Sequence, residues 1–155
     1  MKIGIIVYSQ TGNTLSVAQN LREKLLTAGH SVNLEPIKTT GDGQTDMNKI
    51  QFETLPNISQ YDVVIFGAPV QAFSLSLVMR SYLSQISSME GKKFACLVTQ
   101  FFPYAWLGGN RAISQMKKLC ELKGGKICGT GIVNWSSKER EKKINDAISN
   151  ICASL

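Results

Sequence analysis

The sequence has no long hydrophobic run and few of the residues that bind metals or form disulfides. No apolar stretch in its 155 residues approaches the ~20 residues of a membrane-spanning helix. Its first residues lead into a polar loop without a secretory cleavage site. The four cysteines are scattered without a C-x-x-C pair, and the single histidine has no partner spaced for zinc. We therefore expect a cytoplasmic protein without a metal site or membrane partner, whose reduced thiols pack in or near the core.

Acidic residues are outnumbered by basic ones in the second half of the chain. Residues 1–75 carry five Lys or Arg and six Asp or Glu, whereas residues 76–155 carry twelve and five. The basic residues come singly or in pairs and alternate with Glu, which is typical of solvated helix surfaces. The alternative is a basic face that meets an acidic partner or an anionic cofactor.

Apolar runs alternate with amphipathic segments along the chain. Extended apolar runs predict five strands, at residues 2–8, 31–37, 62–67, 93–99 and 126–133. Amphipathic spacing predicts helices at residues 14–28, 74–87 and 110–122, and a last helix that begins with a capping-box pattern at Ser136-Ser137-Lys138-Glu139. Residues 38–60, with breakers at Gly41-Asp42-Gly43 and Pro56, are interpreted as a long connection with one short helix. We expect a single α/β domain over residues 1–155, a doubly wound parallel sheet with helices on both faces.

Three loops at the predicted carboxyl edge of this sheet, 9–14, 69–74 and 100–109, have distinctive compositions. The first, Ser9-Gln10-Thr11-Gly12-Asn13-Thr14, leads from a strand into a helix, so its backbone N–H groups form an anion site beside the positive end of the helix dipole. Its hydroxyls and amides add donors, and Gly12 allows the backbone to approach a ligand closely. The loop has no lysine, and neither G-x-x-x-x-G-K-[ST] nor G-x-G-x-x-G occurs. We therefore expect a mononucleotide-like monophosphate as the ligand.

The same loop resembles the T/S-x-T-G-N-T phosphate loop of flavodoxins and flavodoxin-like proteins, in its usual place after the first strand. Residues 62–73 resemble the third strand of that family and the loop beside the flavin ring, and residues 94–113 resemble the fourth strand and the second ring loop. The uninterrupted strand at 126–133 resembles the short-chain members. The resemblance implies a flavodoxin-like five-stranded sheet of order 2-1-3-4-5. It also implies bound FMN, with the phosphate on the first loop and the isoalloxazine ring between the other two.

The resemblance carries over to a set of cofactor-binding residues from the three loops: Ser9, Gln10, Thr11, Gly12, Asn13, Thr14, Pro69, Val70, Gln71, Ala72, Phe73, Thr99, Gln100, Phe101, Phe102, Tyr104 and Trp106. Gln71 lies in the region where many relatives carry an aromatic residue that stacks on the flavin, and Phe73 is the aromatic residue available nearby. The four aromatic residues of the other loop suggest a flat ligand, a quinone-like substrate or a partner surface. The alternative is that they pack onto the core or mediate dimerisation.

The two predicted ring loops contain no Asp or Glu, whereas electron-shuttling flavodoxins are typically acidic. A less negative environment stabilises an anionic reduced flavin and raises its potential.

We expect an FMN-binding redox protein that transfers electrons to a partner protein or a small-molecule acceptor. The alternatives are an NAD(P)H-dependent FMN oxidoreductase of quinones or other small acceptors, and a flavin-free relative that binds a partner. We expect no catalytic side chain, because the redox chemistry resides in the flavin, and no nucleic-acid partner.

Overall fold

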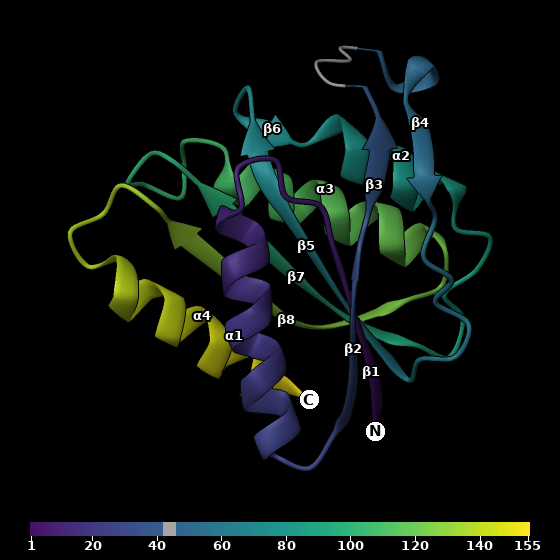
Figure 1. Ribbon diagram of the computed structural model, residues 1–155, viewed down its shortest axis with the longest axis horizontal. Helices are drawn as coiled ribbons and strands as arrows, with labels where there is room; N and C mark the ends of the chain where they lie inside the picture. The colour runs from purple at the N-terminus through teal and green to yellow at the C-terminus, as the bar shows by residue number, and fades with distance from the viewer. Residues whose placement is uncertain (42–45) are drawn as a thin grey trace.

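The computed structural model describes residues 1–41 and 46–155 as a parallel β-sheet with helices on both faces (Figure 1). In chain order the main elements are β1 (Lys2–Val7), α1 (Asn13–Thr27), β2 (Ser31–Pro36), β5 (Val63–Gln71), α2 (Leu77–Gln85), β7 (Lys93–Gln100), α3 (Gly109–Leu122), β8 (Lys126–Asn134) and α4 (Arg140–Ser154). The strand order β2-β1-β5-β7-β8, with parallel pairing throughout, confirms the predicted 2-1-3-4-5 arrangement.

The sheet separates two hydrophobic cores. One core lies between the sheet and α1 with α4, and the other lies between the sheet and α2 with α3. Neighbouring residues of a strand face opposite cores, as Ile5 and Ile6 of β1 do, and both are fully buried. This two-sided burial explains why the central strands are continuous apolar runs rather than alternating ones.

The helix predicted at residues 74–87 is shorter in the structure. Ser74–Leu75 form a short strand, β6, antiparallel to the end of β5, and α2 begins only at Leu77. Ser76 caps the helix, since its hydroxyl accepts a hydrogen bond from the Met79 N–H at 3.2 Å. The apolar spacing of this segment suits a helix, but Leu75 pairs with Val70 instead, and this strand pairing prevails over the local pattern.

The capping-box prediction for the last helix is wrong in its position. Helix α4 begins at Arg140, four residues after the predicted start, and Glu139 stands at the cap position. The Ser136 N–H donates to the Phe101 carbonyl at 3.0 Å, which ties this segment to a neighbouring loop. The Ser137 hydroxyl instead accepts from the Glu139 N–H at 3.2 Å and forms a local turn.

The connection predicted at residues 38–60 contains an antiparallel pair of strands that the sequence analysis missed. Strands β3 (Lys38–Thr40) and β4 (Gln51–Thr54) pair outside the main sheet, and a 3-10 turn, η1 (Met47–Lys49), precedes β4. This turn stands where a short helix was expected. Of the predicted breakers, Asp42 and Gly43 lie outside the described residues. No helix in the described part of the chain is long and apolar enough to cross a membrane.

Candidate functional site

The loops after β1, β5 and β7 all leave the carboxyl edge of the sheet. Strand β1 pairs with β2 on one side and with β5 on the other, so the chain changes direction across the sheet at β1. Open α/β sheets bind ligands outside the carboxyl ends of the strands at such a point. The three loops singled out in the sequence therefore lie where a ligand site is expected.

The first loop is held in shape by a serine and a left-handed glycine. Gly12 precedes α1 with φ of 93°, a conformation that glycine adopts without strain. The Ser9 hydroxyl oxygen accepts hydrogen bonds from the N–H groups of Gly12 and Leu15 at 3.1 and 3.2 Å. Among the described residues, the N–H groups of Asn13 and Thr14 have no such partner. They lie at the positive end of the helix dipole, which is the arrangement that binds an anion.

Thr14 lies beneath this loop rather than facing out of it. Its side chain is buried, and its hydroxyl lies 2.7 Å from the hydroxyl of Thr99, which is also buried, near the end of β7. The sequence analysis expected the Thr14 hydroxyl to add a donor to the anion site. In the structure this hydroxyl joins the first loop to β7, while Thr11 is exposed at the surface of the loop.

The second loop is a tight hairpin. Strand β5 continues to Gln71, and Ala72 and Phe73 form the turn with φ of 50° and 59°. Both residues occupy the left-handed region, which costs non-glycine residues of order 1–3 kcal/mol each. The Gln115 side chain of α3 holds the returning strand, because its Oε1 accepts from the Ser74 hydroxyl at 3.0 Å and from the Leu75 N–H at 2.8 Å.

Contacts with the other two loops fix this hairpin on either side. The Gln71 side-chain amide donates to the Gln10 side-chain oxygen of the first loop at 2.5 Å. On the other side, a Cβ at Gly108 would lie 2.7 Å from Val70 Cγ1 and 2.8 Å from Phe73 Cα, so only glycine fits there. With its φ of 114°, Gly108 brings the third loop into close contact with the hairpin and begins α3.

The third loop is organised from within by Gln100. This side chain is buried, and its amide donates to the carbonyl of Phe102 at 2.9 Å and to the carbonyl of Tyr104. Asn134, at the end of β8, donates a second hydrogen bond to the Phe102 carbonyl at 3.1 Å. The Gln100 Oε1 atom is buried, with no hydrogen-bond partner in the described residues, and a Cβ on Gly109 would lie 2.3 Å from it. Gln100 thus supports the loop and does not face its outer surface.

The aromatic residues of these loops are exposed and lie against one another. Phe73 stacks on Phe102 with ring centroids 5.6 Å apart and an interplanar angle of 12°, and Phe101 meets Phe102 edge-on at 5.8 Å. Tyr104 and Trp106 form a second stacked pair at 5.8 Å and 10°. Phe102 is 43% exposed and Trp106 is 73% exposed, so the rings cover the edge of the sheet instead of filling the core.

The structure brings the three predicted loops together, but some of their predicted site residues are buried and others lie at the surface. Thr14, Thr99 and Gln100 are buried supports, and Gln10, Thr11 and the aromatic residues lie at the surface. Sequence reasoning missed Gln115 and Asn134, which hold the second and third loops from α3 and β8. No local pattern marks either residue, because each acts on a loop distant in the chain.

The comparisons with known proteins agree with this architecture. No family model matches the chain, and the comparison with curated proteins finds no match. Solved structures do match along the whole chain. A flavodoxin from Streptococcus pneumoniae TIGR4 has a TM-score of 0.70 at 16% identity, and oxidised flavodoxin 2 from Bacillus cereus has 0.71 at 18%, each covering 100% of both chains. The fold is flavodoxin-like.

Several of the similar structures are described with bound flavin mononucleotide. The flavodoxin of Fusobacterium nucleatum, bound to flavin mononucleotide, has a TM-score of 0.68 and 16% identity, and the match covers 99% of this chain and 98% of that one. In the present chain, the Asn13 and Thr14 N–H groups lie at the same edge of the sheet as the exposed aromatic rings, and neither N–H group has a partner among the described residues. This combination suits a ligand with an anionic group joined to a flat conjugated ring.

Proposed function

We propose that this protein binds FMN and transfers electrons through it. The observation that carries the proposal is the first loop, whose Asn13 and Thr14 N–H groups stand free of partners within the described residues at the start of α1. Neutral donors at a helix N-terminus suffice for a monophosphate. The flavodoxin-like fold, and the FMN found in a similar structure, support the same ligand.

The proposed phosphate site is the segment from Ser9 to Thr14. A Cβ at Gly12 would meet no atom within 4 Å, so there is open space beside the loop backbone. Ser9 shapes the loop through its two accepted hydrogen bonds, and Thr14 fixes it to β7. The residues present therefore fit a phosphate group, with the backbone as the main donor and Thr11 and Asn13 as the accessible side chains.

The proposed ring site lies between residues 69–73 and residues 99–102. Phe73 and Phe102 are the aromatic side chains at the contact of these two loops, and both are exposed. Because these two rings stack on each other, it is the outer faces of the pair that would lie against a flat ring and exclude water from it. Tyr104 and Trp106 lie further along the third loop, next to each other.

FMN, when bound, would supply the electron-accepting and electron-donating chemistry. The role of the chain is to bind the cofactor, orient its ring and set the electrostatic field around it. The segments 8–14, 68–77 and 99–110 contain no Asp or Glu. A field without carboxylates favours the reduced, more negative cofactor and makes its potential less negative than acidic loops would.

The test is a visible absorption titration of the purified protein with FMN, followed by anaerobic addition of NADPH. The proposal expects saturable FMN binding and a bound flavin that stays oxidised until a separate reductase or reduced carrier is supplied. Rapid bleaching by NADPH alone would overturn the electron-carrier role in favour of an NAD(P)H-dependent oxidoreductase. Absence of FMN binding would contradict the proposal as a whole and favour a flavin-free partner-binding protein.

A further inference from the structure

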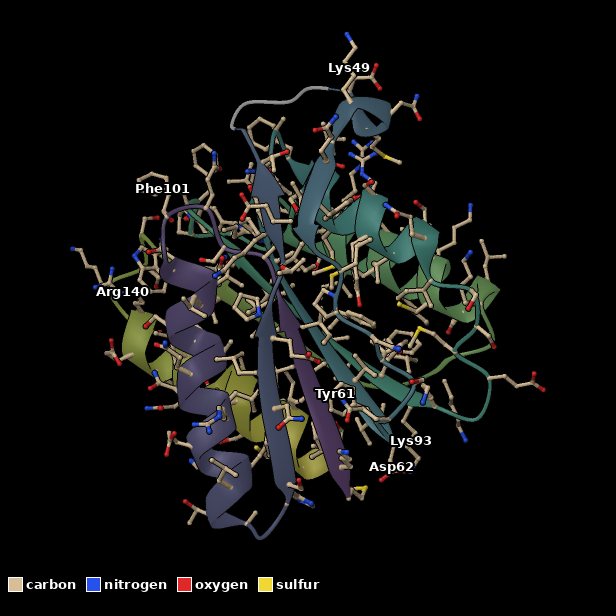
Figure 2. All side chains as sticks on the ribbon, turned by 45° about the vertical axis from the view of Figure 1, so that its right-hand side comes forward. Lys49, Tyr61, Asp62, Lys93, Phe101 and Arg140 are labelled. Carbon is tan, nitrogen blue, oxygen red and sulfur yellow. The ribbon has the colours of Figure 1, made fainter. Side chains whose placement is uncertain are left out.

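A fourth segment, after β8, joins the candidate site, although the sequence analysis interpreted it only as the start of the last helix. The third loop is bound to it by backbone hydrogen bonds, from Trp135 N–H to the Gln100 carbonyl at 2.7 Å and from Ser136 N–H to the Phe101 carbonyl at 3.0 Å. The Lys143 ammonium group of α4 adds a hydrogen bond to the Pro103 carbonyl at 3.3 Å. The aromatic loop (residues 101–106) and the basic segment (residues 138–143) therefore form one continuous surface. Figure 2 places Phe101 and Arg140 on the same side of the molecule.

Three of the four cations of the basic segment are exposed to solvent. Lys138, Arg140 and Lys142 are exposed, and the Arg140 guanidinium lies 4.8 Å from the centroid of the Trp135 ring. The same guanidinium donates to the Trp135 carbonyl at 3.2 Å, so its charge is held in place beside the aromatic loop. Glu139 and Glu141 only partly offset these charges, and the neighbouring loop segments 8–14, 68–77 and 99–110 contain no Asp or Glu.

The aromatic loop has the composition of a protein-binding surface. Exposed Trp, Tyr and Arg side chains in one patch are typical of the residues that contribute most to protein–protein affinity. Tyr104 and Trp106 are 58% and 73% exposed although both are large and stacked on each other. Exposed apolar surface of this kind marks an interaction site rather than a core element.

We propose that the aromatic loop and the basic segment together form a docking surface for a protein partner with an acidic face. The inference deepens the proposed function, because an electron carrier docked here would lie next to the proposed ring site. Docking itself does not depend on the flavin. Charge complementarity assigns the sign of the partner, and the exposed Tyr104–Trp106 pair supplies the apolar centre around which charged residues form a rim.

The arrangement of charge favours a protein over a nucleic acid. In the basic segment, carboxylates alternate with the cations, so Lys138 and Arg140 are separated by Glu139. A nucleic acid presents regularly spaced phosphates and would face these carboxylates, whereas a folded protein can place its acidic groups opposite the cations only.

The test uses one probe protein in two charge states. Cytochrome c is basic, and partial succinylation of its surface lysines reverses its net charge. A succinylated form whose circular dichroism matches that of the native protein is used, and binding of the two forms to the full-length chain is compared by calorimetry at low ionic strength. We expect the succinylated form to bind and to lose affinity as salt is added, and the native form to bind at least about tenfold more weakly. Stronger binding of the native form would overturn the proposal.

A pair of double variants distinguishes binding at this surface from an effect of the protein's overall net charge. Lys138→Glu with Lys142→Glu reverses two exposed charges of the basic segment. Lys93→Glu with Lys126→Glu makes the same change at the opposite end of the strands, where Lys93 pairs with Lys126 and lies far from Arg140 in Figure 2. We expect the first double variant to weaken binding of succinylated cytochrome c about tenfold or more and the second to change it about twofold at most. Equal losses would show that only net charge matters and would overturn the proposal.

Two further measurements keep the outcomes distinct. Calorimetry is run on protein without flavin, and FMN affinity is measured separately for each variant, where we expect no change. Failure to bind FMN would thus refute the proposed function, but the docking measurement would still test the docking surface. Tighter binding of a DNA duplex than of succinylated cytochrome c, lost in the first double variant, would replace the protein partner with a nucleic acid and overturn the proposal.

Discussion

The hydroxyls of Thr14 and Thr99 lie 2.7 Å apart, and both side chains are buried. Thr14 belongs to the first turn of α1, and Thr99 is near the end of β7, two strands away from β1 in the sheet. This contact joins the proposed phosphate loop to the strand that leads into the aromatic loop. It fixes the positions of the two loops relative to each other, which a ligand spanning both of them requires.

A double-mutant cycle on this pair measures its contribution to stability. Thr14→Val leaves the Thr99 hydroxyl buried without its partner, which we expect to cost about 1–3 kcal/mol of the free energy of unfolding. Thr99→Val has the converse effect. The double variant removes both hydroxyls, and we expect it to lose less than the sum of the single changes, as measured by urea denaturation. Strict additivity would show that the two hydroxyls do not interact.

Thr11→Asp tests the phosphate assignment by placing a carboxylate on the exposed surface of the first loop. We expect FMN affinity to fall about tenfold or more, because like charges repel at close range. The change does not threaten the fold, since an acidic residue near a helix N-terminus stabilises the helix by about 0.3–1 kcal/mol. Asn20→Asp, exposed further along α1, makes the same change in charge and serves as the control. Equal affinities for FMN in the two variants would contradict the assignment.

Gln71→Glu tests the electrostatic account of the ring site. A carboxylate beside the flavin disfavours its reduced form, and an interaction of about 1.4 kcal/mol corresponds to about 30 mV for a two-electron couple. We expect a midpoint potential lower by that order in spectroelectrochemical titration. Gln71→Met loses the hydrogen bond to Gln10 without adding charge, so it separates the two effects. A similar shift in both variants would mean that the carboxylate is not responsible.

Cys120 makes stability depend on alkaline pH. Burial raises the pKa of its thiol from 9.0 to about 12, with a further contribution from the nearby Glu121 carboxylate. The folded state thus retains a proton that the unfolded chain releases, so this contribution to stability is complete below pH 9 and is lost as the pH rises towards about 12. The buried Cys96 thiol also has a raised pKa for the same reason, and it adds to the loss.

Replacement of Cys120 by Ala isolates that contribution. The packing lost with the side chain lowers the free energy of unfolding by an amount that does not change with pH. The loss of the thiol should make the pH slope of that free energy flatter by up to about 1.4 kcal/mol per pH unit above pH 9. Urea denaturation at several pH values between 8 and 10.5 measures both quantities. An unchanged slope would show that the Cys120 thiol titrates alike in the folded and unfolded chains.

The sheet could be predicted from the sequence because its physical signal is local. Strands buried on both faces need continuous apolar runs, and the run at Val63–Phe66 shows this directly. The same holds for the loop at Ser9–Thr14, where glycine and small polar residues stand between a strand and a helix. The order of the strands followed from the resemblance to flavodoxins, and the structure has the same order.

Features that depend on distant contacts could not be predicted. Leu75 has helical spacing but pairs with Val70 across a turn whose two residues have positive φ, although neither is glycine. Ser136 begins a sequence typical of a helix start, yet its backbone binds the Phe101 carbonyl. The roles of Gln115 and Asn134 depend in the same way on loops that the chain reaches only after folding.

The central claim is that the first loop holds the phosphate of FMN through its backbone. The most direct measurement follows the backbone amide resonances of Asn13 and Thr14 by nuclear magnetic resonance during titrations with FMN and with riboflavin, which lacks the phosphate. The account predicts that both resonances shift strongly with FMN and little with riboflavin, and that FMN binds about tenfold more tightly or better. Equal affinities, with these two resonances unmoved by FMN, would contradict it.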